Sequence, residues 1–274
     1  MKTDMTLDMF SVKDKVCIVT GGLGLLGSGF CRTLAERGAR VVVLDTREDQ
    51  PLMLERFGNL ANQMLAIGAD ATNKSSLVAA LEKIRAYWGE PQVLVNNAAL
   101  DSPPNAPVSE NGPFETYPEA SFDKVMEVNV KGVMLCCQVF GAAMAKSGKG
   151  SIVNISSIYG MVSPDQRIYE HRRKNGDGFF KPIAYSVSKS SLFNLTRYLA
   201  TYWGAQGVRV NTLTFGGVFN GQDEDFLKGY CSHVPLGRMA KSDEYNGAIL
   251  FLASDASSYM TGSNMVMDGG WTAW

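Results

Sequence analysis

Short, continuously apolar runs alternate with segments of helical periodicity along most of this chain, and this alternation limits the possible folds more than any other feature. The apolar runs cover residues 16–19, 40–44, 64–67, 93–95, 151–155, 208–213 and 264–267. Runs of this length are typical of buried strands, and the helix-length connections between them require right-handed crossovers and parallel pairing. The sequence therefore predicts an α/β fold with a doubly wound parallel sheet, helices on both faces and ligands at the carboxyl ends of the strands.

A glycine-rich turn follows the first apolar run. Glycines stand at positions 21, 22, 24 and 27, and residues 30–38 continue with helical spacing. Glycine lets the backbone approach a pyrophosphate closely, and the amide groups and dipole of a helix N-terminus stabilise its charge. Strand, glycine turn and helix in this order predict a dinucleotide site.

An acidic residue ends the second apolar run. Asp45 lies 18 residues beyond Gly27 (45 − 27), where a carboxylate can accept both ribose hydroxyls of an adenosine and repel a 2′-phosphate. This spacing favours NAD over NADP. Arg47, two residues further on, could instead neutralise such a phosphate, and Asp45 could also end a strand without binding a ligand.

A tyrosine and a lysine stand four residues apart in the stretch Tyr185-Ser186-Val187-Ser188-Lys189. On a helix, both side chains would project from one face. A cation fixed beside a phenol lowers the phenol pKa from about 10, which makes it a usable general acid or base at a carbonyl oxygen. Alternatively, Tyr185 is an ordinary residue of an amphipathic helix and Lys189 is solvated.

Two loops interrupt the alternation. Residues 101–121 contain five prolines and predict a functional loop or lid, or else a passive surface excursion. Residues 163–182 carry an excess of basic residues and connect Ser157 to Tyr185, so both ends of this insertion lie at the catalytic face. We hypothesise that Arg172 and Arg173 help to bind a polar or anionic substrate; a solvated loop or a subunit contact is the alternative.

Two long helices are expected to be buried on more than one side. The first runs from Ser121 to about Lys146 and contains Asn129, a polar residue that a helix interior disfavours unless it has partners or a task. The second follows Tyr185 and is apolar around most of its circumference. One of its faces can meet the sheet and another a second subunit.

Composition excludes several classes of protein. The chain has 274 residues, 45% hydrophobic, with 26 basic against 27 acidic side chains, so we expect one domain over 1–274 and no nucleic-acid or anionic-membrane partner. The first fifteen residues mix charged and apolar types, unlike a signal peptide, and no later run is expected to span a bilayer. Five cysteines and two histidines form no ligand pattern, which predicts a cytoplasmic protein without disulfides or a metal site.

Taken in order, these motifs resemble the short-chain dehydrogenase/reductase family from about Lys15 to Gly270. The motifs are Thr20 to Gly27, Asp45, Asp70, Asn96 to Ala99, Asn129, Ser157, the Tyr185/Lys189 pair and Asp268-Gly269-Gly270. The resemblance implies a Rossmann-type sheet of about seven strands in the order 3-2-1-4-5-6-7. It also implies an N-terminal extension at 1–14, a nicotinamide cofactor, a small-molecule substrate and a homodimer or homotetramer.

The resemblance further implies a role for each site residue. Tyr185 would exchange the proton at the substrate oxygen, Ser157 would hydrogen-bond that oxygen, Lys189 would hold the nicotinamide ribose and lower the phenol pKa, and Asn129 would support a chain of waters. Ser157 is preferred to Ser156 because two residues and a glycine follow it. The implied cofactor contacts are Gly21, Leu23, Gly24, Leu25, Leu26, Asp45, Thr46, Asp70, Ala71, Asn97, Ala98, Ala99, Tyr185, Lys189, Gly216 and Val218.

Three features depart from the family pattern. The glycine spacing T-G-x-x-G-x-x-G resembles the longer sugar-nucleotide branch, although the chain length, Asn96 to Ala99 and the C-terminal Asp-Gly-Gly favour the short, single-domain branch. Phe215-Gly216 replaces the usual Pro-Gly. The gap of 28 residues from Ser157 to Tyr185 (185 − 157) is longer than is usual in this branch.

We expect an oxidoreductase that interconverts a secondary alcohol and a ketone in a sugar, polyol or sugar phosphate, because hydride transfer needs a fixed donor and a matched acid beside the nicotinamide. One alternative is an epimerase or dehydratase that acts on a nucleotide sugar and retains its NAD. Another is a dinucleotide-binding protein without catalysis.

Overall fold

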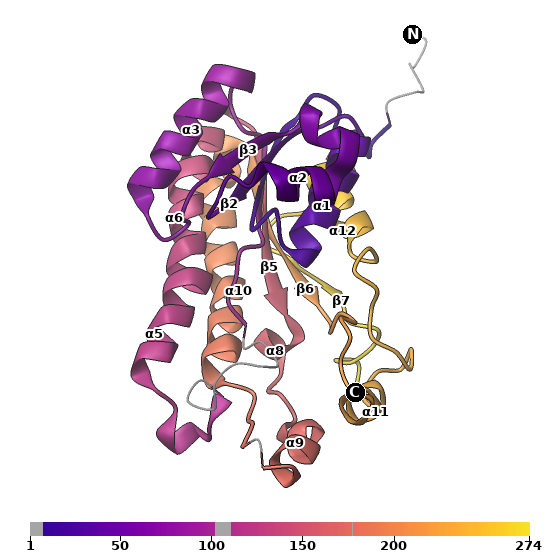
Figure 1. Cartoon of the computed structure of the whole chain (residues 1–274). Coiled ribbons are helices and arrows are strands. Elements are labelled where there is room, and N and C mark those ends of the chain that lie inside the picture. The colour runs from indigo at the N-terminus through magenta and orange to yellow at the C-terminus, as the bar shows by residue number, and fades with distance from the viewer. Residues whose placement is uncertain (1–7, 102–110, 177) are drawn as a thin grey trace.

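Seven parallel strands form one sheet in the order β3-β2-β1-β4-β5-β6-β7 in the computed structural model, which describes residues 8–101, 111–176 and 178–274 (Figure 1). The strands are β1 (Val16–Thr20), β2 (Arg40–Asp45), β3 (Leu65–Gly68), β4 (Val93–Asn96), β5 (Gly150–Ser157), β6 (Val208–Phe215) and β7 (Asn264–Met267). The predicted fold class and strand order are confirmed. The chain winds outward from β1 to β3 and then returns to β4 beside β1, which leaves a crevice at their carboxyl ends.

Helices cover both faces of the sheet. They are α1 (Leu25–Glu36), α2 (Gln50–Phe57), α3 (Lys74–Trp88), α5 (Glu119–Met126), α6 (Val133–Cys136), α7 (Ala142–Ser147), α8 (Ile158–Met161), α9 (Glu170–Lys174), α10 (Ile183–Trp203), α11 (Glu224–Cys231) and α12 (Asn246–Ala253). One face packs against α1, α2 and α12, and the other against α3, α10 and the long helix that contains α5 to α7 (Figure 1).

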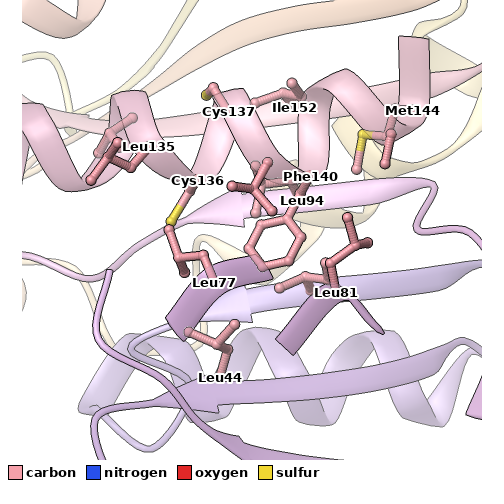
Figure 2. Close-up of a cluster of buried hydrophobic side chains, with 14 of the residues drawn as sticks. Leu44, Leu77, Leu81, Leu94, Leu135, Cys136, Cys137, Phe140, Met144 and Ile152 are labelled. Carbon is pink, nitrogen blue, oxygen red and sulfur yellow. The ribbon is translucent and has the colours of Figure 1, made fainter. Parts of the chain in front are cut away.

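The core between the sheet and α3 shows why these apolar runs become strands. Leu77 and Leu81 of α3 and Phe140 of the long helix point toward Leu94 and Ile152 on the strands (Figure 2). Because β4 and β5 are covered by helices on both sides, every residue of their apolar runs is buried. Each such large side chain stabilises the fold by about 1.5–3 kcal/mol relative to leaving it exposed.

The long helix runs from Glu119 to Ser147, close to its predicted bounds, and contains two π-helical segments, Glu127–Gly132 and Cys137–Gly141. The sequence predicted no membrane-spanning run, yet this helix alone in the described part of the chain has the length and hydropathy of one. Much of its apolar surface packs inside the protein, since 61% of its most apolar window is buried.

The insertion at 163–182 forms a 3-10 turn (Gln166–Tyr169) followed by α9. Ile168, Tyr169 and Phe179 pack against Tyr230 of α11 and Trp271 near the C-terminus, so three segments that are distant in sequence gather below the carboxyl ends of β5 and β6 (Figure 1). Residues 1–7, 102–110 and 177 lie outside the described residues, and with them parts of the predicted N-terminal extension, proline-rich loop and insertion.

Candidate active site

The turn that joins β1 to α1 leaves no room for a side chain at several of its glycine positions. Gly21 has a φ of 62°, and a Cβ at Gly27 would collide with the carbonyl oxygen of Gly21. Helix α1 begins at Leu25 with Gly24 as its N-cap, and among the described residues no side chain caps it and no acidic residue lies in its first turn. The amide groups of Leu25 and Leu26 are therefore oriented to hold an anion such as a pyrophosphate.

Asp45 lies beside this turn. Its carboxylate accepts hydrogen bonds from the backbone amide of Leu23 at 3.1 Å and from that of Thr46 at 2.9 Å. The guanidinium of Arg47 lies 3.9 Å from the carboxylate of Asp49, so its nearest acid is not Asp45.

The end of β4 is bonded directly to the glycine turn. The hydroxyl of Thr20 accepts hydrogen bonds from the backbone amides of Asn97 and Ala98, both at 3.0 Å. The Asn97 side chain donates to the carbonyl oxygens of Thr20 and Gly21. Of the predicted cofactor residues, Asn97 and Ala98 thus line the crevice between β1 and β4, and the exposed Ala99 follows them.

The remaining predicted cofactor residues lie along the same edge of the sheet. Asp70 is exposed after β3 and accepts a hydrogen bond from the Thr72 amide at 2.8 Å, with the buried Ala71 between them. Gly216 follows β6 and donates to the Met267 carbonyl at 2.9 Å, and Val218 pairs with Ala240. The crevice between β1 and β4, its glycine turn and Asp45 fit an extended dinucleotide.

Ser157 is the last residue of β5, and its hydroxyl lies near enough to the phenol of Tyr185, in the first turn of α10, to lower the pKa of that phenol. It also accepts a hydrogen bond from the backbone amide of Tyr159 at 3.2 Å. The hydroxyl of Ser156 instead donates to the carbonyl oxygen of Lys189 at 2.9 Å. The structure therefore brings Ser157, not Ser156, to Tyr185.

Lys189 is buried on the next turn of α10. Its Nζ donates to the carbonyl oxygen of Ile155 at 2.8 Å and lies 5.8 Å from the centre of the Tyr185 ring. Burial lowers the pKa of Lys189 to about 8, and the negative charge of Asp101 acts in the opposite direction.

We expected Lys189 to lower the pKa of Tyr185. In the protein without bound ligands, the pKa of Tyr185 is instead raised. Burial raises the pKa of the phenol well above its usual value, and Asp101 raises it further. The opposing effects, which lower the pKa, come from the positive charge of Lys181 and from the nearby hydroxyl of Ser157. The cation that acts on the phenol is thus Lys181, whose Nζ lies 4.7 Å from the ring centre.

Asn129 lies in the first π-helical segment and connects three parts of the site. Its side-chain amide donates to the carbonyl oxygen of Leu100 at 2.9 Å and to the hydroxyl of Ser188 at 3.0 Å, and its side-chain oxygen accepts from the Leu100 amide at 2.7 Å. Ser188 in turn donates to the carbonyl oxygen of Tyr185 at 2.8 Å. Asn129 therefore fixes the loop after β4 against the turn that carries Tyr185.

The two arginines proposed for substrate binding are engaged within the insertion itself. Arg173 donates to the carbonyl oxygens of Phe179 and Gln166 at 3.0 and 2.8 Å, and the guanidinium of Arg172 lies 4.0 Å above the Phe179 ring. The basic residue that the insertion places beside Tyr185 is Lys181. The sequence reading missed this role, although Lys181 stands four residues before Tyr185.

A crevice that fits a dinucleotide and a Ser157–Tyr185–Lys189 group at one edge of the sheet define the class of this protein. It is a nicotinamide-dependent oxidoreductase with a doubly wound fold.

Comparison with known proteins identifies its family. The family model described as "Enoyl-(Acyl carrier protein) reductase" matches residues 25–272. The chain is 33% identical over 264 residues to the cis-4-hydroxycyclohexanecarboxylate dehydrogenase of Sinomonas cyclohexanicum, covering 95% of this chain and 97% of that protein. It is 29% identical to the NAD-dependent glycerol dehydrogenase of Listeria innocua, covering 96% of each.

A solved structure of a dehydrogenase has a similar fold. The gluconate 5-dehydrogenase of Burkholderia cenocepacia in complex with NADP and tartrate superposes with a TM-score of 0.82 at 25% identity, covering 97% of this chain and 98% of that one. The chain belongs to the short-chain dehydrogenase/reductase family.

Proposed function

We propose that this protein interconverts a secondary alcohol and a ketone in a polyol, sugar or hydroxy acid, with NAD as the preferred cofactor. The observation that carries the proposal is the gathering of Ser157, Tyr185 and the buried Lys189 at the carboxyl edge of the sheet that also holds the glycine turn. The similar proteins are named as dehydrogenases of hydroxycyclohexanecarboxylate, glycerol and gluconate, and these names support a polar alcohol as the substrate.

The site residues divide the work of moving one proton. When bound, the nicotinamide would accept a hydride from the alcohol carbon, or return it to the ketone. Ser157 donates a hydrogen bond to the substrate oxygen, and Tyr185 takes the hydroxyl proton during oxidation or supplies it during reduction. Lys189 holds the nicotinamide ribose, and Asn129 positions Leu100 and Ser188 so that protons can leave along bound waters.

The preference for NAD rests on Asp45. Its carboxylate, fixed by Leu23 and Thr46, can accept hydrogen bonds from ribose hydroxyls and would repel a 2′-phosphate. Arg47 is the nearby residue that could favour NADP, but its guanidinium is turned toward Asp49.

The surface and the thiols support our proposals for the assembly and the location of the protein. Tyr198 and Tyr202 on α10 are each 61% exposed and stack on each other at 5.9 Å, which supports a homodimer or homotetramer through this helix. The five cysteines are free, as expected in the reducing cytoplasm. A monodisperse monomer in light scattering at micromolar concentration would refute the proposed assembly.

A cofactor-reduction screen tests the proposal. Purified protein is mixed with NAD or NADP and with polyols, sugars, sugar phosphates and hydroxy acids, and nicotinamide absorbance is followed. We expect steady NAD reduction with at least one polar secondary alcohol. Conversion of a nucleotide sugar by a protein with tightly bound NAD and no change in absorbance would instead identify an epimerase or dehydratase.

A further inference from the structure

Lys181 is a buried ammonium group beside the proposed catalytic tyrosine. Its side chain is 8% exposed, and its Nζ lies 4.7 Å from the centre of the Tyr185 ring and 6.0 Å from that of Tyr159. It pairs with the carboxylate of Asp101, which is 52% exposed, at 2.5 Å. The positive charge is therefore inside the site, while its protein counter-ion stands at the edge.

The backbone of the insertion holds Lys181 in place. The side-chain amide of Gln166 accepts a hydrogen bond from the Lys181 backbone amide at 2.9 Å and donates one to the Lys181 carbonyl oxygen at 3.0 Å. The two arginines of the insertion, as described above, bind carbonyl oxygens and aromatic rings of the same segment. The loop is thus built so that one basic side chain, Lys181, enters the site.

Lys181 has hydrogen-bonding capacity to spare. An ammonium group carries three donors, and within the described ranges the acceptor that Nζ contacts is Asp101 Oδ1. Its other close neighbours are the faces of the Tyr159 and Tyr185 rings. Donors of a buried cation that point into a site are most strongly satisfied by an anionic oxygen, because a charge-assisted hydrogen bond repays the cost of taking the charge out of water.

The charges around the site also favour an anion. Lys181 and Lys189 each bring a positive charge, and Asp101 brings one negative charge. Burial pulls the pKa of Lys181 down, but Asp101 and the two phenols outweigh this and leave it above its usual value, so Lys181 stays protonated at neutral pH. Among these three described groups one positive charge remains, and a ligand with a single negative charge would balance it.

We propose that Lys181 binds the carboxylate of the substrate, which makes a carboxylate-bearing secondary alcohol the preferred substrate class. This inference rests on the proposed alcohol–ketone chemistry at Tyr185 and goes beyond it by assigning a specificity-determining residue. Lys181 bridges the substrate carboxylate and Asp101, and its fixed distance from Tyr185 sets how far the reacting hydroxyl lies from the carboxylate.

Inhibition by a matched pair of compounds tests the inference in the active protein. Cyclohexanecarboxylate and cyclohexanecarboxamide have similar shape and differ in charge. Each is used to inhibit oxidation of the best alcohol from the screen. We expect the inhibition constant of the carboxylate to be about tenfold or more below that of the amide in the wild-type protein, as a charged hydrogen bond provides.

Three variants assign the difference to Lys181. In Lys181→Met the ratio of the two inhibition constants should fall to about one, whereas Lys181→Arg, which keeps the charge, should retain most of it. Lys174→Met is the matched control, because Lys174 belongs to the same insertion but is 70% exposed and paired with Glu170. It should keep the wild-type ratio.

The outcomes separate this inference from the proposed function. Equal inhibition constants in an active wild-type protein, or an unchanged ratio in Lys181→Met, would overturn the carboxylate site alone. Equal weakening of both inhibitors in Lys181→Met would show a merely structural role and would also overturn it. If melting curves show that Lys181→Met is unfolded, the wild-type ratio and its retention in Lys181→Arg decide. A wild-type protein that oxidises no alcohol with NAD or NADP contradicts the proposed function and this inference with it.

Discussion

The carboxylate of Asp45 accepts a hydrogen bond from the backbone amide of Leu23 at 3.1 Å, so the acid at the end of β2 is fixed against the turn that follows β1. These two elements are neighbours in the sheet, paired from Val16 with Arg40 to Thr20 with Leu44. The position of Asp45 relative to a dinucleotide is therefore set by sheet register rather than by a flexible loop.

Replacing this acid should change the choice of cofactor. In Asp45→Ser the hydrogen bonds to ribose weaken and the repulsion of a 2′-phosphate disappears. We expect kcat/KM with NAD to fall about 10- to 100-fold, as for loss of hydrogen bonds to a charged group, and the NADP-to-NAD ratio to rise. Arg47→Ala serves as the control and should leave NAD kinetics unchanged. An unaltered ratio in Asp45→Ser would mean that Asp45 does not contact the cofactor.

The two glycines of the turn should differ sharply in their tolerance of a methyl group. Gly27→Ala places a Cβ against the carbonyl oxygen of Gly21, whereas in Gly24→Ala the same atom lies 3.2 Å away. We expect Gly27→Ala to lose about 1–3 kcal/mol of unfolding free energy and most of its NAD affinity, and Gly24→Ala to be milder on both measures. Urea denaturation and fluorescence titration with NADH compare them, and equal behaviour would contradict the close approach of α1 to the turn.

The two adjacent serines should separate catalysis from stability. Ser157→Ala removes the hydroxyl that faces Tyr185 and should lower kcat by about 10²- to 10³-fold, as for loss of an oxyanion donor. Ser156→Ala removes a buried hydrogen bond to the Lys189 carbonyl and should cost about 1 kcal/mol of stability with a much smaller effect on kcat. The reverse pattern would assign the catalytic hydroxyl to Ser156.

The buried amine of Lys189 should give the protein a distinctive pH dependence. Its pKa is lowered by burial from 10.5 to about 8, so between these values the folded state binds fewer protons than the unfolded state and stability rises with pH. Below pH 8 the cost of burying the charged Lys189 amine lowers the stability in full. Without added cofactor, wild-type stability should rise relative to Lys189→Met by up to ~3 kcal/mol across this window.

Comparing the wild-type protein with Lys189→Met removes the contribution that other titratable groups make to the pH dependence of stability. Burial raises the pKa of the Cys17 thiol to about 12, which lowers stability at high pH, but it does so equally in both proteins. Urea unfolding at steps from pH 7.5 to 10.5 gives the difference directly. Parallel curves would show that Lys189 is not buried as an amine.

The sheet and most of the strand bounds could be predicted from the sequence because strands covered on both faces need uninterrupted apolar runs. The prediction fell short where a strand continues through a polar residue beyond its apolar run. β5 continues through Ser156 and Ser157, and β6 through Thr214 and Phe215. Thr214 is buried, and its hydroxyl donates a hydrogen bond to the side-chain oxygen of Asn264 at 2.6 Å. Only the fold reveals this partner.

The charges around Tyr185 could not be predicted in the same way. The insertion contains several basic residues, and nothing in their order distinguishes Lys181, which is buried, from Lys174, which is exposed. Its partner Asp101 is 80 residues away in the chain. The predicted direction of the Tyr185 pKa shift was wrong for a related reason. Local spacing shows a neighbouring cation, which lowers the pKa, but not the depth of burial, which raises it by more.

The central claim, that Tyr185 exchanges the proton at the substrate oxygen, is tested most directly by Tyr185→Phe. This variant keeps the ring between Lys181 and Lys189 and removes only the hydroxyl. We expect NADH affinity and melting temperature to remain close to wild type while kcat falls by about 10²- to 10⁴-fold, the contribution of a positioned acid or base. A variant that binds NADH normally and still turns over the best alcohol at the wild-type rate would contradict the account.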